Sequence, residues 1–256
     1  MSGAATRAAI VGLGGAALDD GERMLFRRLP PAGFILFARN CQEPRQVSDL
    51  TAELRALSPR RRVPVLIDQE GGRVMRLRPP HWPALPAAAR IGALAARGEA
   101  LAREAARRLG EAIGGELAAL GIDVDCAPCL DVARPETTTA IGDRAFAADP
   151  DLVGRLGRAF MDGLLAAGVA PVIKHLPGHG RARIDSHLGL PTVDAGLVEL
   201  EAVDLRPFRV CADSPFAMTA HVVYTALDPD RPATHSPAVM QRTPPCRGCS
   251  SVPPKT

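Results

Sequence analysis

Fourteen residues, from Lys174 to His187 (KHLPGHGRARIDSH), concentrate side chains that can move protons or bind polar groups. The segment holds three histidines, and its proline and two glycines prevent a regular helix. Asp185 precedes His187 by two residues, a spacing that lets the carboxylate hold one tautomer of the imidazole and stabilise its protonated form. The pair therefore predicts a general acid/base carried on a loop.

The rest of the chain alternates between strand-like and helix-like segments. Amphipathic helical segments, such as 44–57 and 94–120, lie between apolar runs. The apolar runs are mostly continuous, as in strands covered on both faces, and we expect even the first of them to be buried. They are 8–14, 33–39, 63–68, 122–132, 170–176 and 216–224. Strand and helix in alternation predict an α/β fold with a parallel sheet, either a (β/α) barrel or a doubly wound sheet.

The polar residues favour the barrel. They collect at the ends of successive apolar runs, at Asp68 to Glu70, Asp131, and Lys174 with His175, while His221 lies within the sixth run. In a barrel every strand delivers its carboxyl end to one common mouth, whereas in an open sheet only the strands beside the switch point do so. We therefore expect a (β/α)8 TIM-type barrel that is incomplete, with about six of its eight β/α units present.

Five motifs follow one another in a fixed order along residues 8–240. They are GFILFARN (33–40), LIDQEGGRVMRL (66–77), IGDRAF (141–146), KHLPGHG with its later DSH, and MTAHVVYTALDPDRPATHSPAV (218–239). Together they resemble the bacterial β-N-acetylglucosaminidases (β-N-acetylhexosaminidases) of glycoside hydrolase family 3, enzymes of peptidoglycan recycling. The resemblance implies a barrel and a retaining mechanism in which the histidine of the Asp-Ser-His loop replaces the usual glutamate as acid/base. It also implies a small-molecule substrate with a terminal, non-reducing β-linked N-acetylglucosamine, and neither a cofactor nor a metal.

The resemblance assigns roles to individual residues. His187 would be the acid/base and Asp185 its orienting partner. The residues expected to bind the sugar are Asp68, Arg76, Arg144, Lys174 and His175. A carboxylate such as Asp68 can accept several hydroxyl protons at once. We expect Arg73, close to Arg76 in the same motif, to be a structural neighbour instead.

The resemblance ends near Val239. A retaining glycosidase needs a second carboxylate as nucleophile, which this family carries in a Ser-Asp-Asp-like motif after the Asp-Ser-His loop, and the sequence contains none. The 32 residues after Tyr224 include seven prolines and cannot supply two further strands with helices. We therefore expect a barrel domain over 1–240 and an unrelated, disordered tail over 241–256, left by a frame shift or truncation near Met240. Hydrolysis would then be negligible unless another carboxylate, such as Asp131, substitutes; one alternative is a catalytically dead barrel that only binds sugar.

The amino-acid composition argues against nucleic acid and membrane partners. The net charge of +3 is spread along the chain, and one Trp and one Tyr make base-stacking platforms improbable, so we expect no nucleic acid partner. No apolar run is long enough to cross a membrane. The six cysteines are scattered, which favours reduced thiols and a cytoplasmic location. We expect full-length relatives to be monomeric.

Two rival functions have weaker support. The run GLGGAA (12–17) fits the glycine pattern of an NAD(P)-dependent oxidoreductase, but no clear helix follows it and no acidic residue ends the next strand. Two Cys-x-x-Cys pairs, Cys126 with Cys129 and Cys246 with Cys249, suggest a zinc-binding module. The first pair is expected in a strand, where positions three apart point to opposite faces and cannot readily share one ion.

Overall fold

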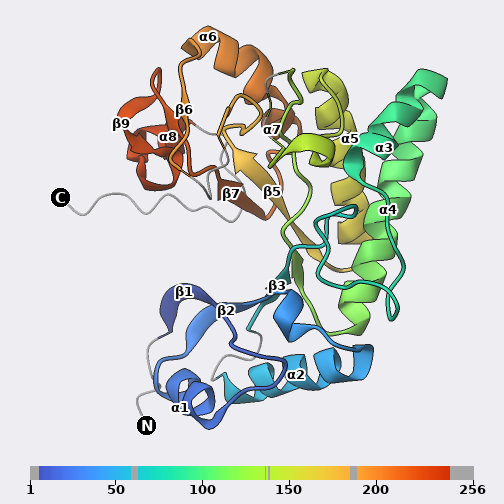
Figure 1. Cartoon of the computed structure of the whole chain (residues 1–256), viewed down its shortest axis with the longest axis vertical. Coiled ribbons are helices and arrows are strands. Elements are labelled where there is room, and N and C mark those ends of the chain that lie inside the picture. Colours follow the sequence, from blue (N-terminus) through green and yellow to red (C-terminus); the bar gives the residue numbers. More distant parts are fainter. Residues whose placement is uncertain (1–5, 59–62, 136, 138, 185–188, 243–256) are drawn as a thin grey trace.

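The computed structural model describes residues 6–58, 63–135, 137, 139–184 and 189–242. Six parallel strands form one curled sheet in the order β1-β2-β3-β4-β5-β7 (Figure 1). Their bounds are Arg7–Gly12 (β1), Pro31–Leu36 (β2), Val65–Ile67 (β3), Val124–Asp125 (β4), Ala170–Leu176 (β5) and Phe216–Thr219 (β7). A doubly wound sheet would reverse its strand order at a switch point, and this sheet does not. The fold is therefore an incomplete TIM-type barrel, as the sequence predicts.

Helices cover the outer face of the sheet. The longer ones are α1 (Asp20–Arg28), α2 (Pro44–Leu57), α4 (Glu99–Ala119) and α5 (Pro150–Ala166). The start of α1 is fixed by Asp19 and Glu22, which cap each other's backbone amides, and α2 and α5 both begin at a proline. Figure 1 shows α4 and α5 side by side. They approach closely because Gly163 faces α4, where an added Cβ would lie 2.1 Å from the carbonyl oxygen of Arg107.

Shorter helices complete the chain between the main elements. They are η1 (Ala38–Asn40), α3 (Ala88–Ala93), η2 (Leu94–Arg97), η3 (Gly142–Arg144), α6 (Leu197–Glu199), η4 (Leu200–Asp204), α7 (Arg206–Val210), η5 (Ala233–His235) and α8 (Pro237–Arg242). The helix expected over 94–120 is therefore divided, because Gly98, with φ of 145°, separates η2 from α4. None of the helices within the described ranges is both long enough and apolar enough to cross a bilayer.

Two expected strands are shorter than predicted. The run 216–224 divides into β7 and β8 (Val223–Tyr224), and β8 joins a separate sheet with β6 (Thr192–Val193) and β9 (Asp228–Pro232). The buried ring of Tyr224 directs this change, since its hydroxyl donates to the carbonyl oxygen of Gly178, 2.7 Å away. The run 122–132 keeps only β4 and one later bridge, between Cys129 and Lys174, because Pro128 has no amide hydrogen for the ladder.

The main core lies between the sheet and the helices. Its fully buried members include Leu36, Leu54, Ile67 and Leu117. The expectation of a buried first strand is wrong, since β1 is largely exposed and Ile10 retains 52% of its accessible surface. The cause is its position at the edge of the sheet, where it pairs with β2 alone among the described strands.

Candidate active site

The carboxyl ends of the central strands carry a network of charged side chains. Lys174, in β5, lies at its centre, with its Nζ 3.0 Å from Oδ1 of Asp68 and 2.5 Å from Oε1 of Glu70. Asp68 and Glu70 follow β3, two strands away in the sheet. Arg144, from η3, donates two hydrogen bonds to Glu70, at 2.9 and 2.7 Å. Parallel strands thus bring together residues that are far apart in the sequence, as expected at a barrel mouth.

Charge pairing keeps the two carboxylates and the lysine of this network ionised. Burial alone would raise the pKa of Asp68, but the ammonium of Lys174 and the guanidinium of Arg76 outweigh it and hold that pKa below its ordinary value. Burial would likewise raise the pKa of Glu70, and Lys174 with Arg144 lowers it. The pKa of Lys174 is raised, because the two carboxylates outweigh its burial. Asp68, Glu70 and Lys174 therefore stay charged near neutral pH.

The loop after β3 is held in shape by buried polar contacts. The side-chain oxygen of Gln69 accepts hydrogen bonds from the backbone amides of Arg76 and Leu77, and its amide nitrogen donates to the carbonyl oxygen of Leu77. Gly71 lies in this loop with φ of 94°, and a Cβ there would be 2.4 Å from the carbonyl oxygen of Pro86. The loop folds back so that Arg76 lies near the carboxyl end of β3, with its Nη2 3.0 Å from Oδ2 of Asp68.

A second group of contacts orients His175. Its Nδ1 lies 2.7 Å from Oδ2 of Asp131, and Oδ1 of Asp131 accepts a hydrogen bond of 2.6 Å from the backbone amide of His179. Burial would raise the pKa of Asp131, but the two histidines hold it far below its ordinary value, so the group is a carboxylate and can only accept. The proton of His175 must therefore sit on Nδ1. Nε2 faces Nη2 of Arg144 at 3.3 Å, and because a guanidinium can only donate, Nε2 of the neutral ring is the acceptor in this contact.

Asp131 is poorly placed to replace a missing nucleophile. It is fully buried, and both of its oxygens accept hydrogen bonds. Attack on a sugar carbon needs an exposed oxygen with a free lone pair, so this geometry argues against the substitution considered above.

The structure brings the predicted sugar-binding residues together. Direct contacts join Asp68, Arg76, Lys174, Arg144 and His175 into one network through Glu70. Arg73 lies outside it and instead pairs with Asp143 and with backbone oxygens of 139–141, as expected of a structural neighbour. Asp185 and His187 lie outside the described residues, so their roles stay predictions.

Exposure separates the network into two layers. Side chains of Asp68, Arg76, Arg144 and His175 keep between 15 and 24% of their accessible surface and can offer polar atoms to a ligand. Those of Lys174 and Glu70 keep 2 and 6%. The buried pair therefore supports the residues that a ligand would touch.

Sequence reasoning assigned no role to Glu70 or His179 and considered Asp131 only as a substitute nucleophile. The sequence does contain a signal for Glu70 and Asp131, because each of these carboxylates follows a central strand at its carboxyl end. Their pairing with Arg144 and His175 depends on the three-dimensional register of distant segments, which the local sequence does not contain.

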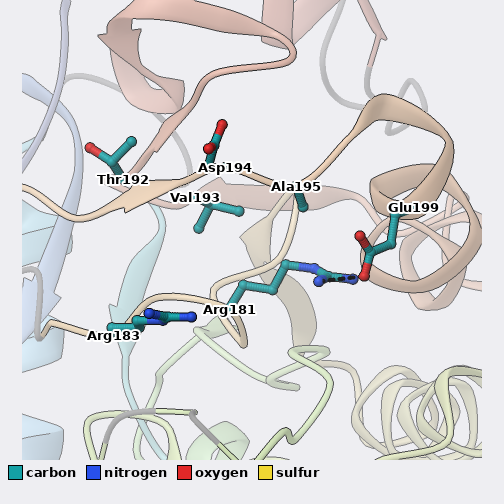
Figure 2. A pocket seen from close by; sticks show the side chains of 7 residues that line it. All are labelled: Arg181, Arg183, Thr192, Val193, Asp194, Ala195 and Glu199. Carbon is teal, nitrogen blue, oxygen red and sulfur yellow. Dashed lines mark ion pairs between the residues drawn. The ribbon is translucent and has the colours of Figure 1, made fainter.

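A pocket of about 460 Å³ lies beside the loop that follows β5 (Figure 2). It is lined by Arg181, Arg183, Thr192, Val193, Asp194, Ala195 and Glu199. Figure 2 shows the guanidinium of Arg181 directed at Glu199, and the two form an ion pair of 2.7 Å. The pocket shares no residue with the charged network.

The rival zinc-binding module has no support from Cys126 and Cys129, the pair that the structure describes. Cys126 packs among Leu66, Val124 and Val172, whereas Cys129 belongs to a different cluster, so the two do not face one ion. Cys41, Cys126, Cys129 and Cys211 are free thiols. Cys246 and Cys249 lie outside the described residues.

Known proteins share both the sequence and the fold. A β-hexosaminidase from Alkalilimnicola ehrlichii is 44% identical over 231 residues, which are 89% of this chain and 65% of that protein. One from Nitrosomonas eutropha is 39% identical over 222 residues, 85% of this chain and 62% of that protein. The chain thus spans just under two thirds of the length of these curated relatives.

Two solved structures carry the comparison further. NagZ from Neisseria gonorrhoeae, in complex with N-trifluoroacetyl-D-glucosamine, has a TM-score of 0.84 and 37% identity, covering 89% of this chain and 67% of that one. A glycoside hydrolase family 3 β-N-acetylglucosaminidase from Paenibacillus sp. has a TM-score of 0.82 and 38% identity, covering 90% and 44%. Residues 17–243 match the family model described as the glycosyl hydrolase family 3 N terminal domain, and the chain therefore belongs to glycosyl hydrolase family 3.

Proposed function

We propose that this chain forms the sugar-binding part of a β-N-acetylhexosaminidase and takes the terminal, non-reducing N-acetylglucosamine of a β-linked substrate. The observation that carries the proposal is the single network of Asp68, Arg76, Arg144, Lys174 and His175 at the carboxyl ends of the central strands. The relatives named as β-hexosaminidases, and the relative solved with a glucosamine derivative, support the same substrate class.

The partly exposed side chains of the network, those of Asp68, Arg76, Arg144 and His175, have the polar groups that a sugar ring needs. Asp68, held ionised by Lys174, can accept hydrogen bonds from adjacent hydroxyls, and bonds to a charged acceptor are stronger than neutral ones. Arg76 and Arg144 can donate to ring and hydroxyl oxygens. Because the partners of each group are fixed beforehand, little ordering is needed when the sugar binds.

The proposed reaction is retaining hydrolysis. His187, oriented by Asp185, would protonate the departing oxygen, as a general acid does in this class of reaction. The sequence contains no Ser-Asp-Asp-like motif that would carry the nucleophilic carboxylate, and Asp131 is buried. We therefore expect this chain to bind the sugar and to turn it over poorly, which makes a sugar-binding barrel without turnover the second candidate.

The cellular setting follows from the same proposal. A role in peptidoglycan recycling would make the substrate a muropeptide fragment and the location cytoplasmic. Both rest on the family resemblance. The oxidoreductase alternative has no support in the sheet order, because the strands show no reversal at which a dinucleotide would bind.

Calorimetry with N-acetylglucosamine and with glucose tests the binding, and a chromogenic N-acetylglucosaminide tests the turnover. We expect N-acetylglucosamine to bind and glucose to bind more weakly. We expect hydrolysis at least about 10³-fold slower than by a version extended through the family's missing strands, as when a catalytic group is removed. A folded chain that binds neither sugar would overturn the binding proposal, and equal turnover by the two versions would overturn the impairment.

A further inference from the structure

Three potential metal ligands meet beside the charged network. Sγ of Cys129 donates to Oδ2 of Asp131 at 3.1 Å, and Nδ1 of His175 lies 2.7 Å from the same oxygen. The three ligand atoms all lie within 4.8 Å of one another. Among the described residues this is the one group of three or more Cys, His, Asp or Glu side chains close enough to hold a single ion.

We propose that Cys129, Asp131 and His175 form a binding site for a thiophilic divalent cation such as Zn²⁺ or Cd²⁺, and that a cation bound there weakens sugar binding. Thiolate, imidazole and carboxylate are all ligands of zinc, which commonly takes three protein ligands and one open position. At bond lengths of about 2.0–2.3 Å, tetrahedral geometry places ligand atoms about 3.3–3.6 Å apart. Oδ2 of Asp131 lies 3.1 Å from Sγ and 2.7 Å from Nδ1, so these two pairs would have to open by roughly half an ångström to reach that spacing.

The charges and protons balance without another reactant. The cation takes the place of the two hydrogens that Cys129 and His175 now share with Asp131. The thiol releases its proton to water, and the imidazole moves its own from Nδ1 to Nε2. Two anionic ligands, the thiolate and the carboxylate, then compensate the charge of the cation.

The tautomer change carries the effect to the sugar site. Nε2 of His175 now faces Nη2 of Arg144 at 3.3 Å, an acceptor opposite a donor. With a cation on Nδ1, Nε2 becomes a donor, and two donors cannot share that contact. His175 and Arg144 would separate, and both belong to the proposed sugar site. This step alone rests on the proposed function; the binding of the cation does not.

The surroundings distinguish Cys129 from an ordinary core thiol. Cys126, three residues earlier, packs in the apolar cluster with Leu66 and Val124. Cys129 instead donates to a buried carboxylate, and the ring of His179 lies edge-on to that of His175 with centroids 5.8 Å apart. Nδ1 of His179 is buried and has no hydrogen-bond partner within the described part of the chain, so the space around the three ligands contains an unmet polar group.

Cadmium titration of the full chain tests the site directly. The chain would carry Cys246→Ser and Cys249→Ser, which removes the tail thiols as competing ligands. Under reducing conditions with a non-thiol reductant, we expect CdCl₂ to produce a thiolate-to-metal charge-transfer absorption that saturates at one equivalent. Cys129→Val should abolish it, while Cys126→Val, a matched change at a buried thiol in the apolar cluster, should leave it intact.

A second variant and a folding control keep the test decisive. Cys129→Ser retains a small polar side chain and should also lose the absorption, with circular dichroism showing that both variants fold. Calorimetry should show N-acetylglucosamine binding weakened at least about tenfold by ZnCl₂ in the parent chain and unchanged in Cys129→Val. An absorption that persists in folded Cys129→Val overturns the site. If the metal-free chain binds no sugar, the proposed function fails while the cadmium result still decides this one.

Discussion

The strands in the middle of the sheet differ from those at its edges in how fully they are covered. Every residue of β3 is buried, and β5 is buried at five of its seven positions. In β1 no residue is fully buried, and β7 is exposed or half-buried throughout. The charged network rises entirely from the middle, from residues that follow β3 and end β5, with Arg144 reaching it from η3.

The difference shows that the site and the closure of the sheet depend on separate parts of the chain. Lys174, Asp68 and Glu70 already satisfy one another, and neighbouring strands on both sides hold them in register. The edges β1 and β7 each have one unpaired side among the described residues, and neither strand contributes a side chain to the network. A half-barrel can therefore present the sugar-binding residues without being closed.

The largest expected effect comes from breaking the network at its centre. Lys174→Met removes the shared cation and leaves two mostly buried carboxylates without it, so we expect the free energy of unfolding to fall by about 3–5 kcal/mol. Urea unfolding measures this. The control is Arg55→Met, which removes the half-exposed pair with Asp123 and should cost about 1 kcal/mol. Similar losses of unfolding free energy in the two variants would mean that the network stabilises the fold no more than a half-exposed ion pair does.

The next effect compares the same substitution in the middle and at the edge. Ile67→Ala in β3, where the side chain is fully buried, should lower the free energy of unfolding by about 2–5 kcal/mol. Ile10→Ala in β1, 52% exposed, should change it by less than about 0.5 kcal/mol. Both are read from urea midpoints. A large loss at Ile10 would mean that β1 is covered in solution, for example by a second copy of the chain.

Acid should weaken the middle of the sheet through Glu70. Its pKa in the folded chain is below the ordinary 4.5, so the stability it contributes is present above that value and is lost as the pH falls. We expect the urea midpoint of the parent chain to drop between about pH 5 and 3, and that of Glu70→Gln to drop less steeply. Parallel curves for the two proteins would mean that the carboxyl group is not held ionised by its partners.

For Asp125, we expect a pH dependence of stability of the opposite sign. Burial raises its pKa well above the ordinary value, and one of its oxygens has no hydrogen-bond partner in the described chain. Its ionisation therefore opposes folding as the pH rises, and a neutral amide of the same shape avoids that cost. Asp125→Asn should keep or raise the urea midpoint at pH 7. A clear loss would show that the charged carboxylate is needed there.

The smallest expected effect concerns self-association through the exposed edge strand β1. Unpaired strand edges pair with other chains, and a charge on the strand opposes this. We expect the parent chain to self-associate, and Ile10→Lys to reduce the associated fraction several-fold by sedimentation velocity. Met24→Lys, which changes an exposed apolar residue of α1, should have little effect. A parent chain that is a monodisperse, cooperatively melting monomer would contradict the prediction.

The sequence predicts the strand order and the members of the network better than it predicts burial. Continuous apolar runs mark β2, β3 and β5, and the polar residues after them meet as a barrel requires. The same type of run at β1 is misleading, because whether a strand is covered depends on neighbours that are distant in sequence. The break after Thr219 is also hidden locally, since it depends on the contact of Tyr224 with Gly178.

The candidate site shows the same limit. Asp68, Lys174 and His175 lie at predicted strand ends, so pattern alone points to them. Arg144 lies in the short helix η3, where no strand end marks it, and only the family motif identifies it. Glu70 gains its role from Arg144, and a contact of that kind follows from the folded arrangement and not from local spacing.

The central claim is that the middle of this sheet holds a preformed sugar site, and calorimetry of N-acetylglucosamine binding to Asp68→Asn tests it most directly. The control is Asp123→Asn, which alters a carboxylate paired with Arg55 immediately before β4, at the opposite end of the sheet. We predict that Asp68→Asn weakens binding at least about tenfold, or about 1.4 kcal/mol, while Asp123→Asn binds as the parent chain does. Equal affinities for the parent chain and a folded Asp68→Asn would contradict the account.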